Sequence, residues 1–184
     1  GCTSSSTKNI QIDADVNAQL NSISDFCIND AESILDFGFP TGGNYKIDGV
    51  SKDSLKPAEL GIGTHTIEYE LTNSCGTSFD TKTFEIYGLP NVSAGSDVTV
   101  CIGESVILSG ANASSYAWNN SVTNATTFSP TSTLTYRVFG TDINGCTNTD
   151  SLQVTVNDLP IVNAGNDTSI CDGESISLNA SGAL

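Results

Sequence analysis

The sequence predicts an all-β protein built of tandem antiparallel β-sandwich domains, and three observations carry that prediction. The stretch Leu89–Ser109 reappears as Leu159–Asn179 with 11 of 21 positions identical, at an offset of 159 − 89 = 70 residues. A fixed period of this size indicates tandem domains. Apolar and polar residues alternate with a period of two, which is typical of half-buried strands. Short, regularly spaced strands with frequent turns favour small sandwiches of about seven strands each.

The repeat divides the chain into four parts. We expect a closing strand of a preceding repeat at 1–14, whole repeats at 15–88 and 89–158, and the opening strands of a following repeat at 159–184. The first assignment rests on Gly1-Cys2-Thr3, which is similar to Gly145-Cys146-Thr147 before a second closing strand. Because the 184 residues contain no Met, we interpret the chain as an internal stretch of a longer array.

In the first repeat, strands are expected at Thr66–Leu71 and Thr83–Tyr87, where apolar and polar residues alternate. Glycines at 42–43 and 61–63 are expected to form turns between strands. Residues 53–60 could form a single helical turn, and Pro57 limits its length.

In the second repeat, the same alternation predicts strands at Tyr116–Trp118, Leu134–Phe139 and Leu152–Val156. Asn144-Gly145 lies between the last two and predicts a tight type I′ hairpin turn, in which both central residues have positive φ.

The composition excludes several classes of partner. Six Lys and Arg against 21 Asp and Glu give a net charge of −15. Nucleic acids and anionic membrane surfaces are therefore disfavoured, since binding them requires clustered basic residues. No apolar run approaches the length of a membrane span, so no membrane insertion is expected. The six Cys and the high acidity fit an exported, oxidised, extracellular protein.

The cysteines predict one disulfide in each repeat. Cys27 and Cys75 belong to the first repeat, and Cys101 and Cys146 to the second. Each bond would close a loop of about 45–50 residues and remove about 4 kcal/mol of denatured-state entropy in the chain-entropy model. Such a staple suits repeats too small to bury a large core.

Cys2 and Cys171 are then expected to have no partner within the chain. A Cys2–Cys171 bond is the rival, but the two residues should lie two domains apart. Metal binding is a weaker alternative, because the chain has no Cys-x-x-Cys and its only His is His65.

Two groups of motifs carry a family resemblance. The first repeat has Cys27-Ile-Asn-Asp-Ala, Gly38-Phe-Pro-Thr-Gly-Gly-Asn-Tyr45 and Gly61-Ile-Gly-Thr-His-Thr-Ile-Glu-Tyr69. It resembles an immunoglobulin-like repeat of very large surface proteins of Bacteroidota. The second has Cys101-Ile-Gly-Glu-Ser, Tyr116-Ala-Trp118 and Asp142-Ile-Asn-Gly-Cys146. It resembles a PKD-like repeat of the same proteins.

The resemblance implies a function as well as a fold. Such repeats build adhesins exported by the type IX secretion system, including the SprB-type gliding-motility adhesins. The fold class is then tandem immunoglobulin-like antiparallel β-sandwiches, and the chain would be a non-enzymatic stalk region at the cell surface. Its partners would be neighbouring repeats of the same polypeptide, with surface polysaccharide or other surface proteins as further candidates. The alternatives are a polysaccharide-binding module and a spacer within a secreted hydrolase.

Candidate chemistry has a plain structural explanation at each position. His65 lies in an alternating strand, and we interpret it as an ordinary strand residue rather than a catalytic base. No cofactor is expected, although calcium is an alternative because Asp97 and Glu104 recur as Asp167 and Glu174. Asp142-Ile-Asn-Gly145 is read as a hairpin turn rather than a calcium loop. Trp118 is expected in the core beside the disulfide, rather than on a sugar-stacking platform with Tyr116.

Two serines are candidate glycosylation sites. Asp53-Ser54-Leu55 and Asp150-Ser151-Leu152 resemble the Asp-Ser/Thr-apolar signal for O-glycosylation of exported Bacteroidota proteins. We therefore expect O-glycan on Ser54 and Ser151.

Overall fold

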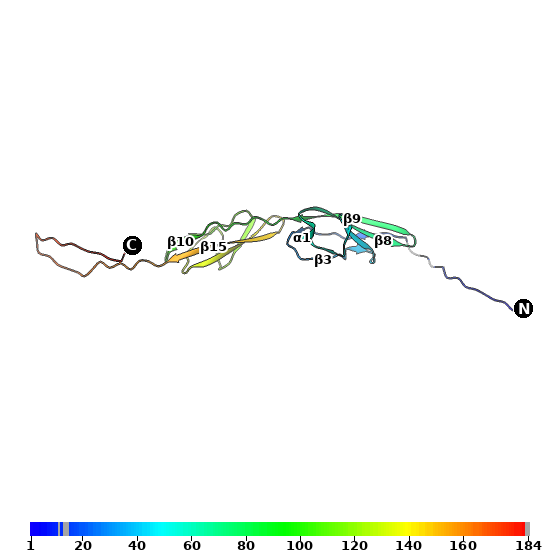
Figure 1. Cartoon of the computed structure of the whole chain (residues 1–184), viewed down its shortest axis with the longest axis horizontal. Helices are drawn as coiled ribbons and strands as arrows, with labels where there is room; N and C mark the ends of the chain where they lie inside the picture. Colours follow the sequence, from blue (N-terminus) through cyan, green and yellow to red (C-terminus); the bar gives the residue numbers. More distant parts are fainter. Residues whose placement is uncertain (11, 13–14, 183–184) are drawn as a thin grey trace. The chain divides into compact units, whose positions relative to one another are not determined.

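The computed structural model describes residues 1–10, 12 and 15–182. These residues form an all-β fold with one short helix, and the chain divides into two compact units. One comprises Gly1–Leu89 with Asn144–Cys146, and the other comprises Pro90–Ile143 with Thr147–Leu184. Each unit is an immunoglobulin-like β-sandwich, which confirms the expected fold class (Figure 1).

The first unit contains a five-stranded sheet with the order β2-β9-β8-β5-β6. Its two longest strands form one hairpin, β8 and β9, in which Gly63 pairs with Ile86 and Asn73 with Gly76. Two smaller sheets, β1-β4 and β3-β7, complete the sandwich. The elements are β1 Gln19–Leu20, β2 Phe26–Cys27, β3 Ser33–Ile34, β4 Gly38–Phe39, β5 Asn44–Ile47, β6 Val50–Ser51, β7 Ser54–Leu55, α1 Pro57–Leu60, β8 Gly63–Asn73 and β9 Gly76–Tyr87.

The second unit contains a four-stranded sheet with the order β10-β15-β14-β12 and a small sheet of β11 and β13. The bridge between Ser93 and Ala111 adds a further pairing. The strands are β10 Val98–Cys101, β11 Val106–Ile107, β12 Ser115–Trp118, β13 Thr127–Phe128, β14 Leu134–Thr141 and β15 Thr147–Asn157.

One strand pair in each unit is parallel rather than antiparallel. β2 runs parallel to the closing strand β9, with Cys27 opposite Tyr87. In the same way β10 runs parallel to β15, with Cys101 opposite Asn157. The other strand pairings that are described are antiparallel, and in each of these two a short early strand joins the edge of the closing strand and runs in the same direction.

The alternation in the sequence places one face of each long strand in a core. Ile67 and Tyr69 of β8 are buried, and so are Leu152 and Val154 of β15. Each unit has its own buried cluster, one including Ile47, Leu55, Ile67, Tyr69, Phe84 and Ile86, the other Leu108, Trp118, Tyr136, Val138, Leu152 and Val154. The period-two prediction is confirmed, although Leu134 at the start of β14 is 45% exposed.

The first core requires glycine at two positions beside Tyr69. A Cβ added to Gly38 would lie 2.5 Å from Tyr69 Cε2, and one added to Gly43 would lie 2.5 Å from Tyr69 Cζ. Real Cβ atoms do not approach other atoms so closely, so a buried aromatic ring fixes both glycines of the Gly38–Tyr45 motif.

Turns follow the sequence with one correction. The helical turn forms as α1 and begins at Pro57, whose missing N–H needs no partner there. The β14–β15 hairpin turns at Asn144-Gly145, and Gly145 has a φ of 88°. Asn144 is not among the residues with positive φ, so the turn is not type I′. Five residues, 142–146, separate the strands. A loop of this length does not need positive φ at two adjacent residues, as a two-residue type I′ turn does.

The terminal segments carry little regular structure. Residues 1–10 and 12 form no strand, and Gln11 of the expected closing strand lies outside the described residues, as do 13 and 14. Near the other end, Asn163 forms an isolated bridge with Ser181. The equivalent bridge, Ser93 to Ala111, lies 163 − 93 = 70 residues earlier. The bridge at the start of the second unit therefore recurs 70 residues later, near the end of the chain. Residues 183 and 184 lie outside the described residues.

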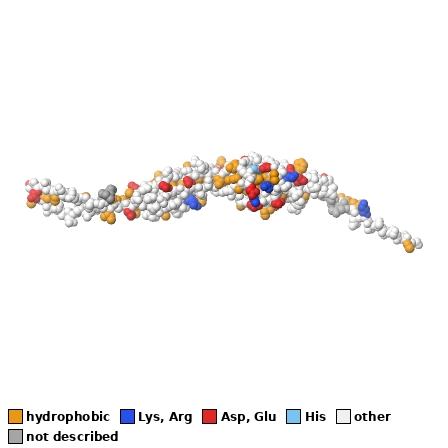
Figure 2. Space-filling model, viewed as in Figure 1, with side chains coloured by type: hydrophobic (Ala, Val, Ile, Leu, Met, Phe, Trp, Pro, Cys, Tyr) orange, Lys and Arg blue, Asp and Glu red, His pale blue; other side chains and the backbone are white. Residues whose placement is uncertain are grey.

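No helix in the described part of the chain is long and apolar enough to cross a membrane. Charged side chains gather over the first unit on the face shown in Figure 2. In the first unit, Lys46 forms ion pairs with Glu68 at 2.9 Å and with Glu70 at 2.5 Å. Lys46, one of the few basic residues of this acidic chain, is thus neutralised by two neighbouring carboxylates.

Candidate functional site

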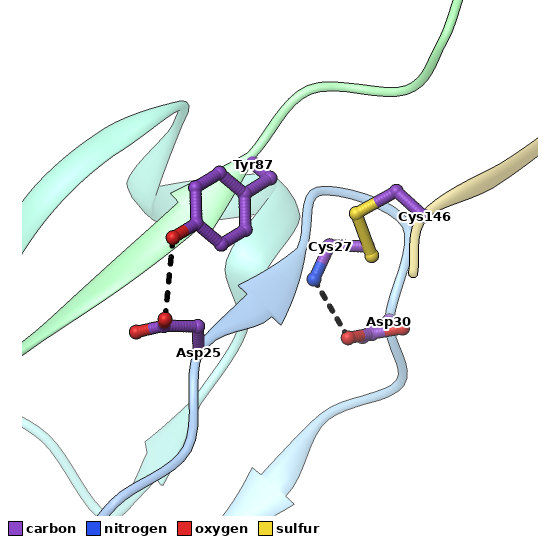
Figure 3. Close-up of a disulfide and its surroundings, with 5 residues drawn as sticks. All are labelled: Asp25, Cys27, Asp30, Tyr87 and Cys146. Atoms are coloured by element: carbon purple, nitrogen blue, oxygen red, sulfur yellow. Dashed lines mark hydrogen bonds between the residues drawn. A yellow bond between two sulfur atoms is a disulfide. The ribbon is translucent and has the colours of Figure 1, made fainter. Parts of the chain in front are cut away.

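The site with the most distinctive chemistry is built on a short turn after β2. The backbone N–H of Cys27 donates to Asp30 Oδ2 at 2.7 Å, and the N–H of Asp30 donates back to the Cys27 carbonyl at 3.0 Å. The N–H of Ile28 donates to the Tyr87 carbonyl at 2.9 Å, which continues the parallel pairing. The Cys27 side chain is therefore held on a backbone bonded on both sides (Figure 3).

Cys27 forms a disulfide with Cys146 (Figure 3). Their Cα atoms are 5.6 Å apart and the residues are separated by 119 positions. Cys146 is fully buried and follows Gly145 at the tip of the β14–β15 hairpin. The tip residues Asn144–Cys146 belong to the first unit, whereas the strands that they connect belong to the second.

This bond corrects the expected pairing of Cys27 with Cys75 and of Cys101 with Cys146. Cys75 directly precedes β9, while Cys27 lies opposite Tyr87 at the far end of that strand. Twelve residues of extended chain span about 40 Å. In the second unit, Cys146 precedes β15 and Cys101 lies opposite its last residue, about 35 Å away. A disulfide needs Cα atoms within about 7 Å, so neither expected bond can form.

The remaining cysteines differ in exposure. Cys2, Cys75 and Cys171 are exposed, and Cys101 is half-buried. The backbone N–H of Cys75 donates to Asn73 Oδ1 at 2.8 Å in the turn between β8 and β9. That Cys2 and Cys171 have partners outside the chain stays a prediction.

Buried His65 forms a polar pair with Asp48, whose side chain is 47% exposed, and the sequence did not reveal this contact. His65 is 9% exposed, with Nδ1 2.7 Å from Asp48 Oδ2 and Nε2 3.1 Å from the Gly61 carbonyl oxygen. Asp48 Oδ1 also accepts the N–H of Thr66 at 2.9 Å. Burial alone would lower the pKa of His65, but the hydrogen bonds to Asp48 and Gly61 outweigh it and raise the pKa. The His65 hydrogen bond holds the pKa of Asp48 below its ordinary value.

This geometry leaves His65 no nitrogen with which to act as a base. A carbonyl oxygen only accepts hydrogen bonds, so Nε2 must carry a proton, and Nδ1 faces a carboxylate. A catalytic His needs one ring nitrogen directed at a nucleophile. The arrangement instead suits an imidazolium that ties β8 to the turn at Asp48.

The two candidate glycosylation serines have different surroundings. Ser54 lies in β7 and is half-buried, in a polar surface hollow of about 270 Å³ that also contains Lys52, Lys56 and Glu59. Ser151 lies in β15, exposed and opposite Arg137 of β14. Their modification stays a prediction.

The acidic residues considered for calcium are bonded to the backbone. Asp97 Oδ1 accepts the N–H of Gln153 at 2.7 Å, and Glu104 Oε2 accepts the N–H of Cys101 at 2.7 Å. Glu174 repeats the second contact with Cys171 at 3.2 Å. Asp167 lies in an exposed stretch. Among the described residues, no group of three or more His, Cys, Asp or Glu could hold a metal ion.

Trp118 belongs to the core of the second unit, as expected, although the Cys101–Cys146 disulfide expected beside it does not form. Its Nε1 donates to Asn124 Oδ1 at 2.9 Å. Half-buried Tyr116 has its hydroxyl bonded to the N–H and the carbonyl of Ala113, each at 2.7 Å. A ring in the core cannot stack on a sugar from solvent, so these two residues do not form a platform.

Sequence reasoning missed two carboxylates that each accept a backbone N–H from an early segment of the same repeat; we call them carboxylate clamps. Asp80 Oδ2 of β9 accepts the N–H of Leu20 at 2.8 Å, and Asp150 Oδ2 of β15 accepts the N–H of Ala94 at 2.8 Å. The hydrogen bond from Leu20 lowers the pKa of Asp80, and the bond from Ala94 lowers the pKa of Asp150. The available signal was the spacing, since 150 − 80 = 70 residues and a hydroxyl residue follows each Asp.

Comparison with known proteins gives likeness of fold only. No family model matches the chain, and no curated protein matches it. Solved structures that are similar include a chimeric titin Z1Z2-Z1Z2 tandem functionalised with a GRGDS peptide from fibronectin. That match has 15% identity and a TM-score of 0.29, and covers 75% of this chain and 96% of that one.

Two further solved structures are similar to the same degree. The titin Ig tandem A164-A165 matches at 12% identity and a TM-score of 0.28, over 77% of this chain and 97% of that one. A Bacteroides ovatus protein of the mixed-linkage glucan utilization locus, SGBP-B in complex with a mixed-linkage heptasaccharide, matches at 15% identity and a TM-score of 0.30. That match covers 74% of this chain and 44% of the glucan-locus protein.

Proposed function

We propose that this chain is part of the non-enzymatic stalk of a secreted cell-surface adhesin, and that it holds a distal binding tip away from the cell. The observation that carries the proposal is the use of its reactive side chains. His65, Asp97, Glu104 and Asp150 each bond to backbone groups that hold strands and turns together. Side chains that could perform chemistry are occupied in maintaining the fold, which is what a mechanical spacer requires.

The disulfide supports a location outside the cytoplasm, because such bonds persist in oxidising compartments. The net charge of −15 opposes binding to nucleic acid. Export by the type IX system and a role in gliding motility rest on the family resemblance of the repeats.

If the chain is a stalk, adhesion should depend on the number of repeats and not on their sequence. If it is a binding module, adhesion should depend on the sequence of the repeat that binds. In the native host, deletion of residues 89–158 should reduce adhesion while secretion continues. The matched variant replaces 89–158 with a second copy of 15–88, which keeps the number of repeats. We expect this replacement to retain most adhesion.

Loss of adhesion in both variants, with normal surface display, would contradict the stalk and favour a binding role for 89–158. A glycan array probed with the isolated chain tests the alternative function, a polysaccharide-binding module, directly. We expect no retained polysaccharide, and saturable binding abolished by substitutions around the Ser54 hollow would support the polysaccharide-binding module instead.

A further inference from the structure

Cys101 occupies the same local structure as the disulfide-bonded Cys27. Each ends a short strand parallel to the closing strand of its unit. The N–H of Cys101 donates to Glu104 at 2.7 Å, as that of Cys27 donates to Asp30 at 2.7 Å. In both turns the acidic residue donates its own N–H to the cysteine carbonyl at 3.0 Å. Backbone and carboxylate thus present the two thiols in the same way.

The partner of Cys27 identifies the kind of cysteine that this turn accepts. Cys146 lies at a hairpin tip immediately before a closing strand, one repeat further along the chain. Cys101 cannot use the tip of its own repeat, because Cys146 lies at the opposite end of β15 and is already bonded to Cys27. Within the described part of the chain Cys101 has no disulfide partner.

We propose that Cys101 is a disulfide site for the hairpin-tip cysteine of a further repeat that follows residue 158. Residues 159–182 reproduce the opening of the second unit, including the bridge from Asn163 to Ser181 and the turn in which Glu174 accepts the N–H of Cys171. Each strand-end cysteine would then bond to the tip cysteine of the next repeat, so that the array is linked covalently from repeat to repeat.

The chemistry is thiol–disulfide exchange. Cys101 and the tip cysteine lose two protons and two electrons as their sulfur–sulfur bond forms. A disulfide oxidant accepts the electrons, and its own sulfur–sulfur bond breaks to give two thiols. Oxidised glutathione supplies this oxidant during refolding in vitro.

The test is a tandem duplication within the full chain, with a second copy of residues 89–158 inserted between 158 and 159. After oxidative refolding and alkylation, non-reducing peptide mapping should show Cys101 bonded to Cys146 of the added copy, and Cys27 bonded to the original Cys146. In the unduplicated chain, Cys101 should be alkylated almost completely. Cys101→Ser in the duplicated chain should expose the added Cys146 to alkylation, whereas Cys171→Ser should not.

Three results would overturn the inference: Cys101 bonded to a cysteine of its own repeat, Cys101 bonded to another molecule, or Cys101 alkylated in a folded duplicated chain. The duplicated chain carries Trp118 in both copies of 89–158, so native Trp fluorescence reports the folding of the two copies together. If the duplicated chain does not fold, mapping of the protein from its native host decides, since Cys101 must there be linked to a downstream tip cysteine. The inference shares with the proposed stalk the premise of further repeats but not the adhesive role. A failed adhesion assay therefore leaves this bond standing, and the reverse also holds.

Discussion

His65 and Asp48 form a proton-linked pair, and its effect on stability follows from the two pKa shifts. The pKa of His65 is raised, so its contribution is fully present below the unfolded value of about 6.5 and is lost as pH rises through the folded value. The pKa of Asp48 is lowered, so its contribution is present above about 3.9 and is lost as pH falls through the folded value. The pair therefore stabilises the first unit most between about pH 4 and 6.5.

The pKa of His65 can be measured without overlap from other imidazoles, because the chain contains one His. We expect an NMR titration of His65 to give a midpoint above about 6.5, and Asp48→Asn to lower it. Asn tolerates the positive φ of 49° at this position, so the substitution removes charge without backbone strain. An unchanged midpoint in Asp48→Asn would contradict the pairing.

Tyr69 supplies a second test on a single residue. Its buried hydroxyl accepts the N–H of Gly43 at 2.8 Å and donates to the Pro40 carbonyl. Tyr69→Phe leaves both groups without that partner and should lower the free energy of unfolding by about 1–3 kcal/mol. Tyr45→Phe is the control, since half-buried Tyr45 accepts a single N–H, from Gly38, and should cost less. Denaturant titration followed by circular dichroism measures both, and equal costs would count against the prediction.

The glycosylation prediction is also made at single residues. We expect O-glycan on Ser54 and Ser151 in protein from the native host. Ser151 is the more accessible of the two, because it is exposed whereas Ser54 is half-buried. Intact-mass and peptide analysis checks both, with Ser151→Ala as the control, and two unmodified peptides would end the prediction.

At the scale of elements, the closing strands are fixed by carboxylates. Asp80 of β9 and Asp150 of β15 each hold the backbone of an early segment of the same repeat. Both pKa values are lowered, so the stabilisation is present above about pH 3.9 and is lost as pH falls through the folded values.

Asp150→Asn should therefore destabilise the second unit at neutral pH. The difference from the original protein should shrink as the pH falls below the lowered pKa, since the original carboxylate is then also uncharged. Trp118 is the only Trp and lies in this unit, so its fluorescence during thermal unfolding measures the effect. A difference that stays constant down to low pH would contradict the clamp.

Strand prediction succeeded where the pattern was local. Alternation located β8, β9, β14 and β15, because burial of one sheet face imposes a period of two on the sequence. Two-residue strands such as β2 and β11 are too short to show a period. The parallel pairing of β2 and β10 was not predictable, since it depends on which strand edge an early segment meets.

For the whole molecule, the sequence predicts an extended rod. The Leu-Pro junctions at Leu89 and Leu159 follow the closing strands within a few residues, and such short connections leave little slack. We expect small-angle scattering to give a radius of gyration well above the ~16 Å of a compact chain of this length. A value near ~16 Å would mean that the repeats pack side by side, and the stalk proposal would lose its mechanical basis.

The sequence by itself determined the repeat, the all-β class, the long strands and the core position of Trp118, because these follow from periodicity and from contacts between neighbours in the chain. Tertiary structure decided the disulfide and the polar contacts. Cys27 lies nearer in sequence to Cys75, but a single β-strand separates those two by about 40 Å, whereas Cys146, 119 residues away, is brought within bonding distance. The contacts of His65 with Asp48 and of Asp150 with Ala94 likewise join distant segments. Spacing along a chain fixes which residues share a strand face, but only the packing of strands fixes which strand ends meet.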